Sequence, residues 1–207
     1  MEVRKYLNEQ DFDILVLLEV TPRWDEYLKG LANIYPYRKK EVRNDNFGIA
    51  LLSKKKIENI EFKRLSRYGV PTIIADVAIG KEKISLIGTH PVPPTARIPF
   101  KDRNDQFQKL NEIALELEKK NEVVLVGDFN CTSFSPNFSL ITKNTSLKDT
   151  RKGFGILHSW WADVEFLNLA IDHAFVTNGL AVVNRSVGPY VGSDHLPIEL
   201  EIGFKAE

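Results

Sequence analysis

Short apolar runs that stop at a glycine or a polar residue recur along the chain. The clearest, residues 123–126, has no polar break, contains three β-branched valines and stops at Gly127. This pattern is typical of a strand buried on both faces. Residues 14–18 repeat it, and residues 197–204 alternate like a strand with one buried face. Further strands are predicted at residues 46–52, 57–65 (an edge strand), 72–79 paired with 83–89 as a hairpin, 170–176 and 181–188.

Helices are predicted where apolar residues recur every three or four positions. The clearest pattern covers residues 103–120, and shorter helices are expected at residues 3–10, 21–31 and 136–143. Residues 91–99 hold four prolines, which predicts a rigid loop without regular structure. Strands that alternate with few helices, some of them joined as hairpins, indicate an α/β protein with mixed sheets instead of a doubly wound parallel sheet.

Composition places the chain among ordinary globular proteins. It has 207 residues, 43% of them hydrophobic and 27% charged, with a formal net charge of zero. No shift in composition marks a linker, so one domain over residues 1–207 is expected. Zero net charge gives no general attraction to nucleic acid or anionic lipid. Residues 38–67, however, hold ten basic and four acidic residues, which fits either solvated loops or a phosphate-facing rim.

The single cysteine, Cys131, excludes an internal disulfide and a cysteine-rich zinc site, and it is expected to be a small packing residue. No apolar stretch approaches 18 residues, and the first residues lack a signal-peptide pattern. A soluble domain without a membrane span is therefore expected. Its compartment stays open between the cytoplasm and attachment to a membrane in a longer parent protein.

Polar residues gather where the predicted strands end. Glu19 and Asp128 each follow an apolar run, and Asn130 lies two positions after Asp128, so both side chains point to the same side of an extended segment. Gly127 before them allows a close backbone approach. Three of the four histidines end short polar motifs, at residues 88–90, 171–173 and 193–195. Enzymes often assemble a site from such strand ends.

These motifs, in this order, resemble the endonuclease/exonuclease/phosphatase superfamily with its DNase I-like fold. Gly-Asp-Phe-Asn at residues 127–130 with Ser-Asp-His at 193–195 is the specific part, and the match covers nearly the whole chain. The run from Gly88 to Pro94 and the pair Arg103 and Gln106 are most similar to a bacterial branch that often carries hydrophobic N-terminal segments. The resemblance implies a four-layer α/β sandwich, with two packed mixed β-sheets flanked by helices.

The resemblance also implies a metal-dependent phosphoesterase that hydrolyses phosphodiester bonds. Glu19 is similar to the family's ligand for Mg²⁺ or Mn²⁺, a hard oxygen donor, and Asp194 is expected near the metal. Asp128 resembles the residue that orients or deprotonates the attacking water. Asn130 resembles the amide that binds the phosphoryl oxygens.

The histidines complete the implied site. His195 resembles the histidine that contacts the phosphate, and Asp172 the buried acid that orients it. His90 is a candidate general acid near the leaving group. Arg103 is a candidate phosphate contact, although it also suits the start of its helix. His173 points away from Asp172 on a strand and is expected to pack.

Several alternatives remain open. Nucleic acid is the first substrate expected, because residues 38–67 offer a surface for a phosphate backbone. A phosphorylated lipid or inositol head group is the second, and a non-catalytic binding module is the alternative from another class. A zinc hydrolase is a weaker rival, because its ligands are histidine-rich. Trp160 and Trp161 are expected to pack with His158 or to stack a base.

One feature departs from the family pattern. Family members begin with a strand that ends in an asparagine near the metal, whereas this sequence starts in or just before the first helix. Either a parent protein supplies that strand before Met1, or the chain is a true short form. A missing inner strand is expected to leave unpaired backbone groups on its neighbours and to weaken metal binding.

Overall fold

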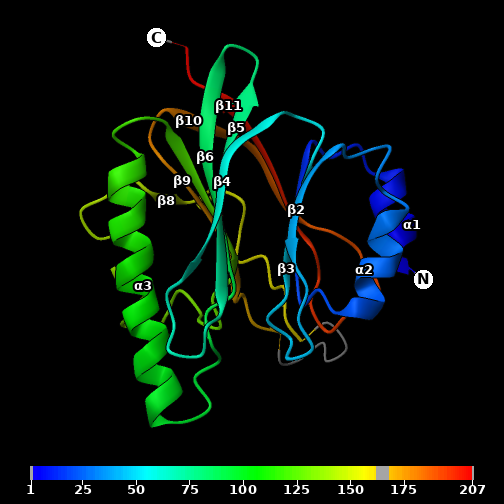
Figure 1. Cartoon of the computed structure of the whole chain (residues 1–207). Helices are drawn as coiled ribbons and strands as arrows, with labels where there is room; N and C mark the ends of the chain where they lie inside the picture. The colour runs from blue at the N-terminus through cyan, green and yellow to red at the C-terminus, as the bar shows by residue number, and fades with distance from the viewer. Residues whose placement is uncertain (1, 162–167, 207) are drawn as a thin grey trace.

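A computed structural model describes residues 2–161 and 168–206, and within them two β-layers pack face to face between helices (Figure 1). The larger layer is a six-stranded sheet. Its strands, in spatial order, are β4 (Ile57–Arg64), β5 (Pro71–Ile79), β6 (Glu82–Thr89), β7 (Glu122–Asp128), β9 (Asp172–Val176) and β8 (Lys148–Asp149). The pairing of β6 with β7 is parallel and the others are antiparallel, so this sheet is mixed, as predicted.

The opposing layer consists of two antiparallel sheets in the part of the chain that the structure describes. One contains β1 (Ile14–Leu18), β3 (Ile49–Ser53) and β2 (Tyr37–Glu41), and the other contains β10 (Leu180–Val187) and β11 (Ile198–Phe204). Apolar side chains of both layers meet in one buried core, which includes Leu51, Ile73 and Val124. Burial of these side chains holds the layers together.

Helices cover the two outer faces. The short helices α1 (Glu2–Glu9) and α2 (Pro22–Lys29) pack on the sheet of β1, β3 and β2. The long helix α3 (Arg97–Leu117) and the 3₁₀ helix η1 (Phe138–Ile141) cover the six-stranded sheet. Figure 1 shows α3 on one side of the molecule and α1 and α2 on the other. The predicted four-layer α/β sandwich is therefore confirmed.

Two element predictions were wrong. Helix α3 begins at Arg97, six residues before the predicted start, because Pro99 falls in its first turn, where the missing N–H costs nothing. Arg103 therefore lies inside the helix instead of at its beginning. No strand was predicted over β2, which is almost entirely charged. It is an exposed edge strand, and charged side chains are common there because they discourage further pairing.

The first described element is α1, as the sequence predicted. Strand β1 packs near β7, and β11 packs near β9, the neighbour of β7. Among the described residues, β1 pairs with β3 alone and β11 with β10 alone, so each has one unpaired edge. None of the helices described by the structure is both long enough and apolar enough to span a bilayer.

Candidate active site

The strand ends bring the polar motifs together at one edge of the sandwich. His90 follows β6 and Asp128 ends β7, and because these strands are parallel, their carboxyl ends are adjacent. Asp172 begins β9, which runs antiparallel to β7 and places Asp172 directly opposite Asp128. The loop before β11 carries His195 into the same cluster.

Asp128 lies between two histidines. One of its carboxylate oxygens, Oδ2, is 3.3 Å from Nε2 of His90 and 3.9 Å from Nε2 of His195. The other, Oδ1, accepts a hydrogen bond of 2.7 Å from the backbone N–H of Asn130. The carboxylate is buried, and this backbone bond fixes its orientation, so Oδ2 is the oxygen turned to the histidines.

Asp172 holds His195 in place. Its Oδ2 accepts hydrogen bonds from Nδ1 of His195 at 2.8 Å and from the hydroxyl of Ser159 at 2.6 Å. The structure thus brings together the pair that the resemblance implied. Ser159 was missed, because a serine in an irregular loop carries no sequence signal. Its backbone carbonyl also accepts from Leu196 N–H, which aligns its loop with His195.

Electrostatics favour a charged imidazole. Burial opposes the charge on His195, but the hydrogen bond to Asp172 and the nearby carboxylates together raise its pKa to about 9. Burial raises the pKa of Asp172, and the bond to His195 opposes that rise. The raised pKa of His195 favours the protonated ring, in which Nδ1–H donates to Asp172 and Nε2–H is directed away from it.

Gly127 is required by the approach of two strands. A Cβ atom built on Gly127 would lie 1.8 Å from the backbone oxygen of Thr89, its partner in the parallel ladder of β6 and β7. Because that atom belongs to the backbone, no side-chain movement can relieve the contact. The close approach predicted from the sequence is confirmed. It brings the end of β7, with Asp128, directly beside the end of β6.

Two residues at the site have left-handed backbone conformations. Glu19, just after β1, has φ 58°, and Asn130, just after β7, has φ 48°. Such conformations cost energy in residues other than glycine, and they persist where the surroundings enforce them. Both residues are therefore held in their positions at the edge of the sheets by the rest of the fold.

The carboxylates form an oxygen-rich group. Partial burial raises the pKa of Glu19, with further contributions from Asp194 and Asp128, while His90 and His195 oppose the rise. These five side chains therefore lie near one another. A set of carboxylate oxygens suits Mg²⁺ or Mn²⁺ better than Zn²⁺, which prefers histidine and cysteine.

A second group within metal-ligand distance lies in the residues that the structure describes. The ligand atoms of Asp128, Asp172 and His195 are all within 4.8 Å of one another. Because Nδ1 of His195 is already bonded to Asp172, this group is first a hydrogen-bond network. Glu19 and Asp194 are not part of this group, and their role as cation ligands stays a prediction.

Arg103 is not placed where a direct phosphate contact would require it. Its side chain is buried, 3% exposed, and its guanidinium donates a hydrogen bond of 2.7 Å to the backbone oxygen of Asn130. It lies behind the site, and we do not assign it to substrate binding. The expectation that it serves the start of its helix is corrected as well, because the helix begins at Arg97.

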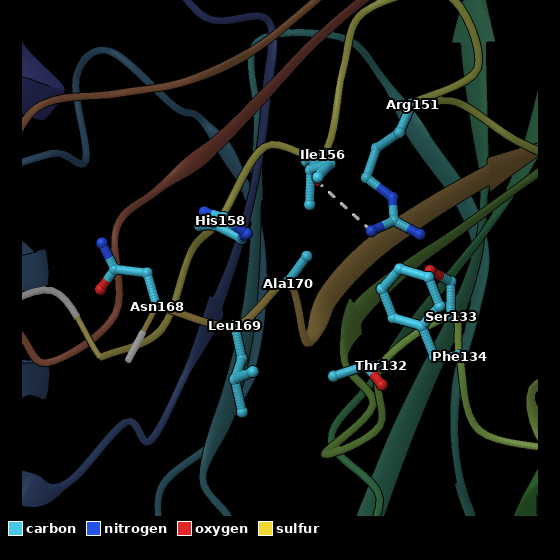
Figure 2. A pocket seen from close by; sticks show the side chains of 9 residues that line it. All are labelled: Thr132, Ser133, Phe134, Arg151, Ile156, His158, Asn168, Leu169 and Ala170. Carbon is cyan, nitrogen blue, oxygen red and sulfur yellow. Dashed lines mark hydrogen bonds between the residues drawn. The ribbon is translucent and has the colours of Figure 1, made fainter. Parts of the chain in front are cut away.

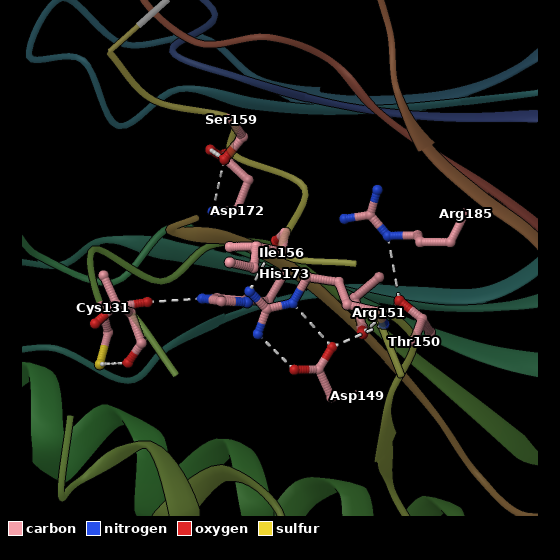
Figure 3. Close-up of polar contacts among 11 residues, drawn as sticks. Cys131, Asp149, Thr150, Arg151, Ile156, Ser159, Asp172, His173 and Arg185 are labelled. Atoms are coloured by element: carbon pink, nitrogen blue, oxygen red, sulfur yellow. Dashed lines mark hydrogen bonds and ion pairs between the residues drawn. The ribbon is translucent and has the colours of Figure 1, made fainter. Parts of the chain in front are cut away.

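His173 and Cys131 pack behind the site, as predicted. His173 is fully buried, and its Nε2 lies 2.7 Å from the backbone oxygen of Cys131 (Figure 3). Burial, and after it the charge of the nearby Arg151, lower the pKa of His173 to about 4, so the ring is neutral and donates this hydrogen bond. Arg151 itself pairs with Asp149 in the same buried cluster.

Figure 2 shows a pocket whose exposed lining is mostly apolar. Its cavity volume is about 50 Å³, and two of its lining residues are near site residues in sequence, since Thr132 lies two residues after Asn130 and Ala170 two before Asp172. Phe134 is 85% exposed at the pocket. The other lining residues are Ser133, Arg151, Ile156, His158, Asn168 and Leu169. The walls therefore include one exposed aromatic ring.

The tryptophans stack on each other. The rings of Trp160 and Trp161 are 5.2 Å apart and nearly parallel, and Trp160 also lies 6.2 Å from His195. Trp160 is half-buried and Trp161 is 42% exposed. Packing accounts for Trp160, while base stacking by Trp161 stays a prediction. His158 lines the apolar pocket, beside Ser159.

The basic stretch of residues 38–67 is largely neutralised. Eight of its ten basic side chains form ion pairs with acids, several of which lie outside the stretch, such as Asp11 and Asp102. Within the described residues, only Arg38 and Lys39 of the ten lack an ion pair. The surface expected to follow a phosphate backbone is therefore much weaker than the sequence count suggested.

A profile of the Endonuclease/Exonuclease/phosphatase family matches residues 2–195. The chain belongs to this family. Family membership supports the expected hydrolysis of phosphate esters, and the cluster of acids and histidines is the chemistry that such a reaction needs. The curated proteins include no match to this sequence.

Solved structures show the same fold as this family member. Truncated TDP2 from Caenorhabditis elegans is 20% identical, with a TM-score of 0.77 over 95% of this chain and 86% of that one. TDP2 from D. rerio, in complex with a single-strand DNA product, is 16% identical, with a TM-score of 0.82 over 97% and 90%. An endonuclease/exonuclease/phosphatase from Bacteroides vulgatus is 18% identical, with a TM-score of 0.78 over 98% and 89%.

Proposed function

We propose that this protein is a phosphodiesterase that cleaves nucleic acid with the help of Mg²⁺ or Mn²⁺. The observation that carries the proposal is the position of Asp128 between His90 and His195, with Asp172 fixing His195 from behind. A carboxylate beside two imidazoles offers the base and the acid that hydrolysis of a phosphodiester by water uses.

Each residue has a distinct part in the proposed reaction. Asp128 takes the proton of the attacking water through Oδ2, because Oδ1 is bound to the Asn130 N–H. The charged His195 stabilises the negative charge that develops on the phosphoryl oxygens, and Asp172 keeps its ring oriented. His90 donates a proton to the leaving oxygen. The carboxamide of Asn130 binds a phosphoryl oxygen.

The metal completes this set. Glu19 and Asp194 are the residues proposed to hold it, because their carboxylates lie with the catalytic group and are not engaged with His195 as Asp172 is. When bound, a divalent cation neutralises charge on the phosphate oxygens and favours attack by a nucleophile.

Nucleic acid is the substrate that the surroundings favour. The apolar pocket with the exposed Phe134 offers a planar ring a place to stack beside the reacting phosphate. A similar structure, that of D. rerio TDP2, contains a single-strand DNA product. Because the basic stretch is mostly paired, recognition is proposed to depend on the nucleotides next to the scissile bond, and not on a long run of phosphates.

Parallel hydrolysis assays test the proposal. Supercoiled plasmid, a single-stranded oligonucleotide and a phosphoinositide are incubated with the protein in Mg²⁺, in Mn²⁺, in Zn²⁺ and in EDTA. His195→Ala and Asp128→Asn are the inactive variants, and Glu116→Gln, an exposed carboxylate on α3, is the matched control. We expect metal-dependent cleavage of nucleic acid that both active-site variants abolish and the control retains.

The other outcomes each have a meaning. Cleavage of the phosphoinositide alone would replace nucleic acid with a lipid head group as the substrate. A strong preference for Zn²⁺ would contradict the proposed metal. If the folded protein cleaves nothing but binds an oligonucleotide, the chain is a binding module and the proposed hydrolysis is wrong.

A further inference from the structure

Asn130 carries the proposed phosphoryl contact in a backbone conformation that needs support. Its φ of 48° lies in the left-handed region. Its own groups make two contacts: the backbone N–H donates to Asp128, and the side-chain Nδ2 donates to the backbone oxygen of Pro91 at 3.0 Å. Neither contact fixes the peptide group that follows Asn130. If Asn130 returned to an ordinary backbone conformation, the carbonyl of that peptide would point in another direction.

Arg103 binds that carbonyl. Its Nη1 donates to the Asn130 oxygen at 2.7 Å, and its Nη2 lies 3.2 Å from Oδ1 of Asn104. The guanidinium is packed against Phe100 and Phe107, with ring centroids at 5.1 and 5.4 Å. These contacts fix the guanidinium plane, because the helix and two aromatic rings surround it.

The burial of Arg103 is unusual for a charged side chain. The side chain is 3% exposed, yet no carboxylate of the described residues lies within ion-pair distance of it. Burying an arginine without an acid is costly, since the charge loses its hydration. A methionine or leucine would fill the same space at a lower cost. What those residues cannot supply is a strong donor to the Asn130 carbonyl.

The next peptide group is held in the same way. His173 donates from Nε2 to the backbone oxygen of Cys131 at 2.7 Å (Figure 3). Two successive carbonyls after β7 thus accept hydrogen bonds from buried side chains, one on α3 and one on β9. The two elements that flank this loop fix its path from both sides.

We infer that Arg103 is a positioning residue, which holds Asn130 in its left-handed conformation and thereby keeps its carboxamide aimed at the phosphoryl group. Arg103 itself does not touch the substrate. The inference rests on the proposed function for the identity of the group that Asn130 binds. The placement of Asn130 by Arg103 is a property of the folded protein and does not depend on activity.

Lys109 provides a matched control. It lies on the same helix, and its Nζ donates to the backbone oxygen of Leu65 at 2.7 Å, away from the Asn130 loop. Lys109→Met and Arg103→Met therefore each remove one contact between a cation and a carbonyl. Misplacing a catalytic group by about 1 Å can cost about 100-fold in rate, so we expect kcat to fall about 100-fold in Arg103→Met with KM changed less than threefold. Lys109→Met is expected to retain the wild-type kcat.

Two further variants separate positioning from general damage. Arg103→Lys keeps a buried donor and is expected to recover about tenfold of the lost kcat. Arg103→Met combined with Asn130→Ala is expected to be no slower than Asn130→Ala alone, because both changes remove the same contact. Additive losses in the double variant, or an unchanged kcat in Arg103→Met, would overturn the inference.

Hydrogen exchange tests the placement of Asn130 without an activity assay. In Arg103→Met the amide of Asn130 is expected to exchange at least tenfold faster than in wild type, while Lys109→Met leaves it unchanged. If the wild-type protein hydrolyses none of the substrates, the proposed function fails, and this exchange measurement still tests the placement of Asn130. Equal exchange at Asn130 in all three proteins would refute the role of Arg103.

Discussion

The neutral, buried His173 makes the stability of the fold depend on pH. Replacing it with glutamine removes the titrating ring and keeps an N–H group that can donate to the Cys131 oxygen. Phenylalanine would fill the space but leave that carbonyl unpaired. His173→Gln therefore isolates the proton linkage from the hydrogen bond.

The expected magnitude follows from the pKa. Burial lowers the pKa of His173 from 6.5 to about 4. Between these values the unfolded chain binds a proton that the folded protein excludes, so stability rises with pH across this window. The stabilisation is fully present above pH 6.5 and is lost as the pH falls toward 4. A shift of this size corresponds to roughly 3 kcal/mol.

Urea unfolding at half-unit steps between pH 4 and 8 measures this linkage. We expect the free energy of unfolding of the wild type to fall relative to that of His173→Gln by roughly 3 kcal/mol between pH 7 and pH 4. Other titrating groups are shared by the two proteins and cancel in the difference. If the two curves stay parallel across this range, His173 titrates normally, and the reasoning about its burial is wrong.

Three other changes have definite expected results. Gly127→Ala would force a Cβ to within 1.8 Å of the Thr89 oxygen. We expect the free energy of unfolding to fall by roughly 4 kcal/mol or more, measured by thermal unfolding, or the expression yield to show no soluble protein. Ser159→Ala removes a donor from the buried Asp172 carboxylate, and urea unfolding at pH 7.5 is expected to show a loss of roughly 1.5–3 kcal/mol. Mg²⁺ is expected to raise the melting temperature of the wild type but not of Glu19→Gln, and an equal rise in both would contradict a metal at Glu19.

The layers and the site motifs could be predicted from the sequence because both depend on local patterns of apolar and polar residues. Apolar runs identified β1 and β7, and the polar residue after each run marked Glu19 and Asp128. Strand β2 could not be predicted, because its pairing with β3 and not its own composition makes it a strand. A charged segment of this kind reads as loop.

Other parts of the site depend on contacts that no local pattern encodes. Ser159 reaches Asp172 only because its loop runs alongside Leu196. Arg103 was singled out by its position in a motif, but its burial and its bond to the Asn130 carbonyl follow from the packing of α3 on the sheet. The family resemblance named the residues, and the three-dimensional structure separates those that gather at the edge of the sheets from those buried behind them.

The pairing of the basic residues in positions 38–67 with nearby acids also bears on how the protein would meet a long nucleic acid. Each phosphate that a protein neutralises releases counterions. A surface with many unpaired basic side chains therefore binds with a steep dependence on salt and lets the protein slide along its target. Here only Arg38 and Lys39 of that stretch remain unpaired in the described part of the chain. If the proposed action on nucleic acid holds, this stretch would add little to the salt dependence of binding.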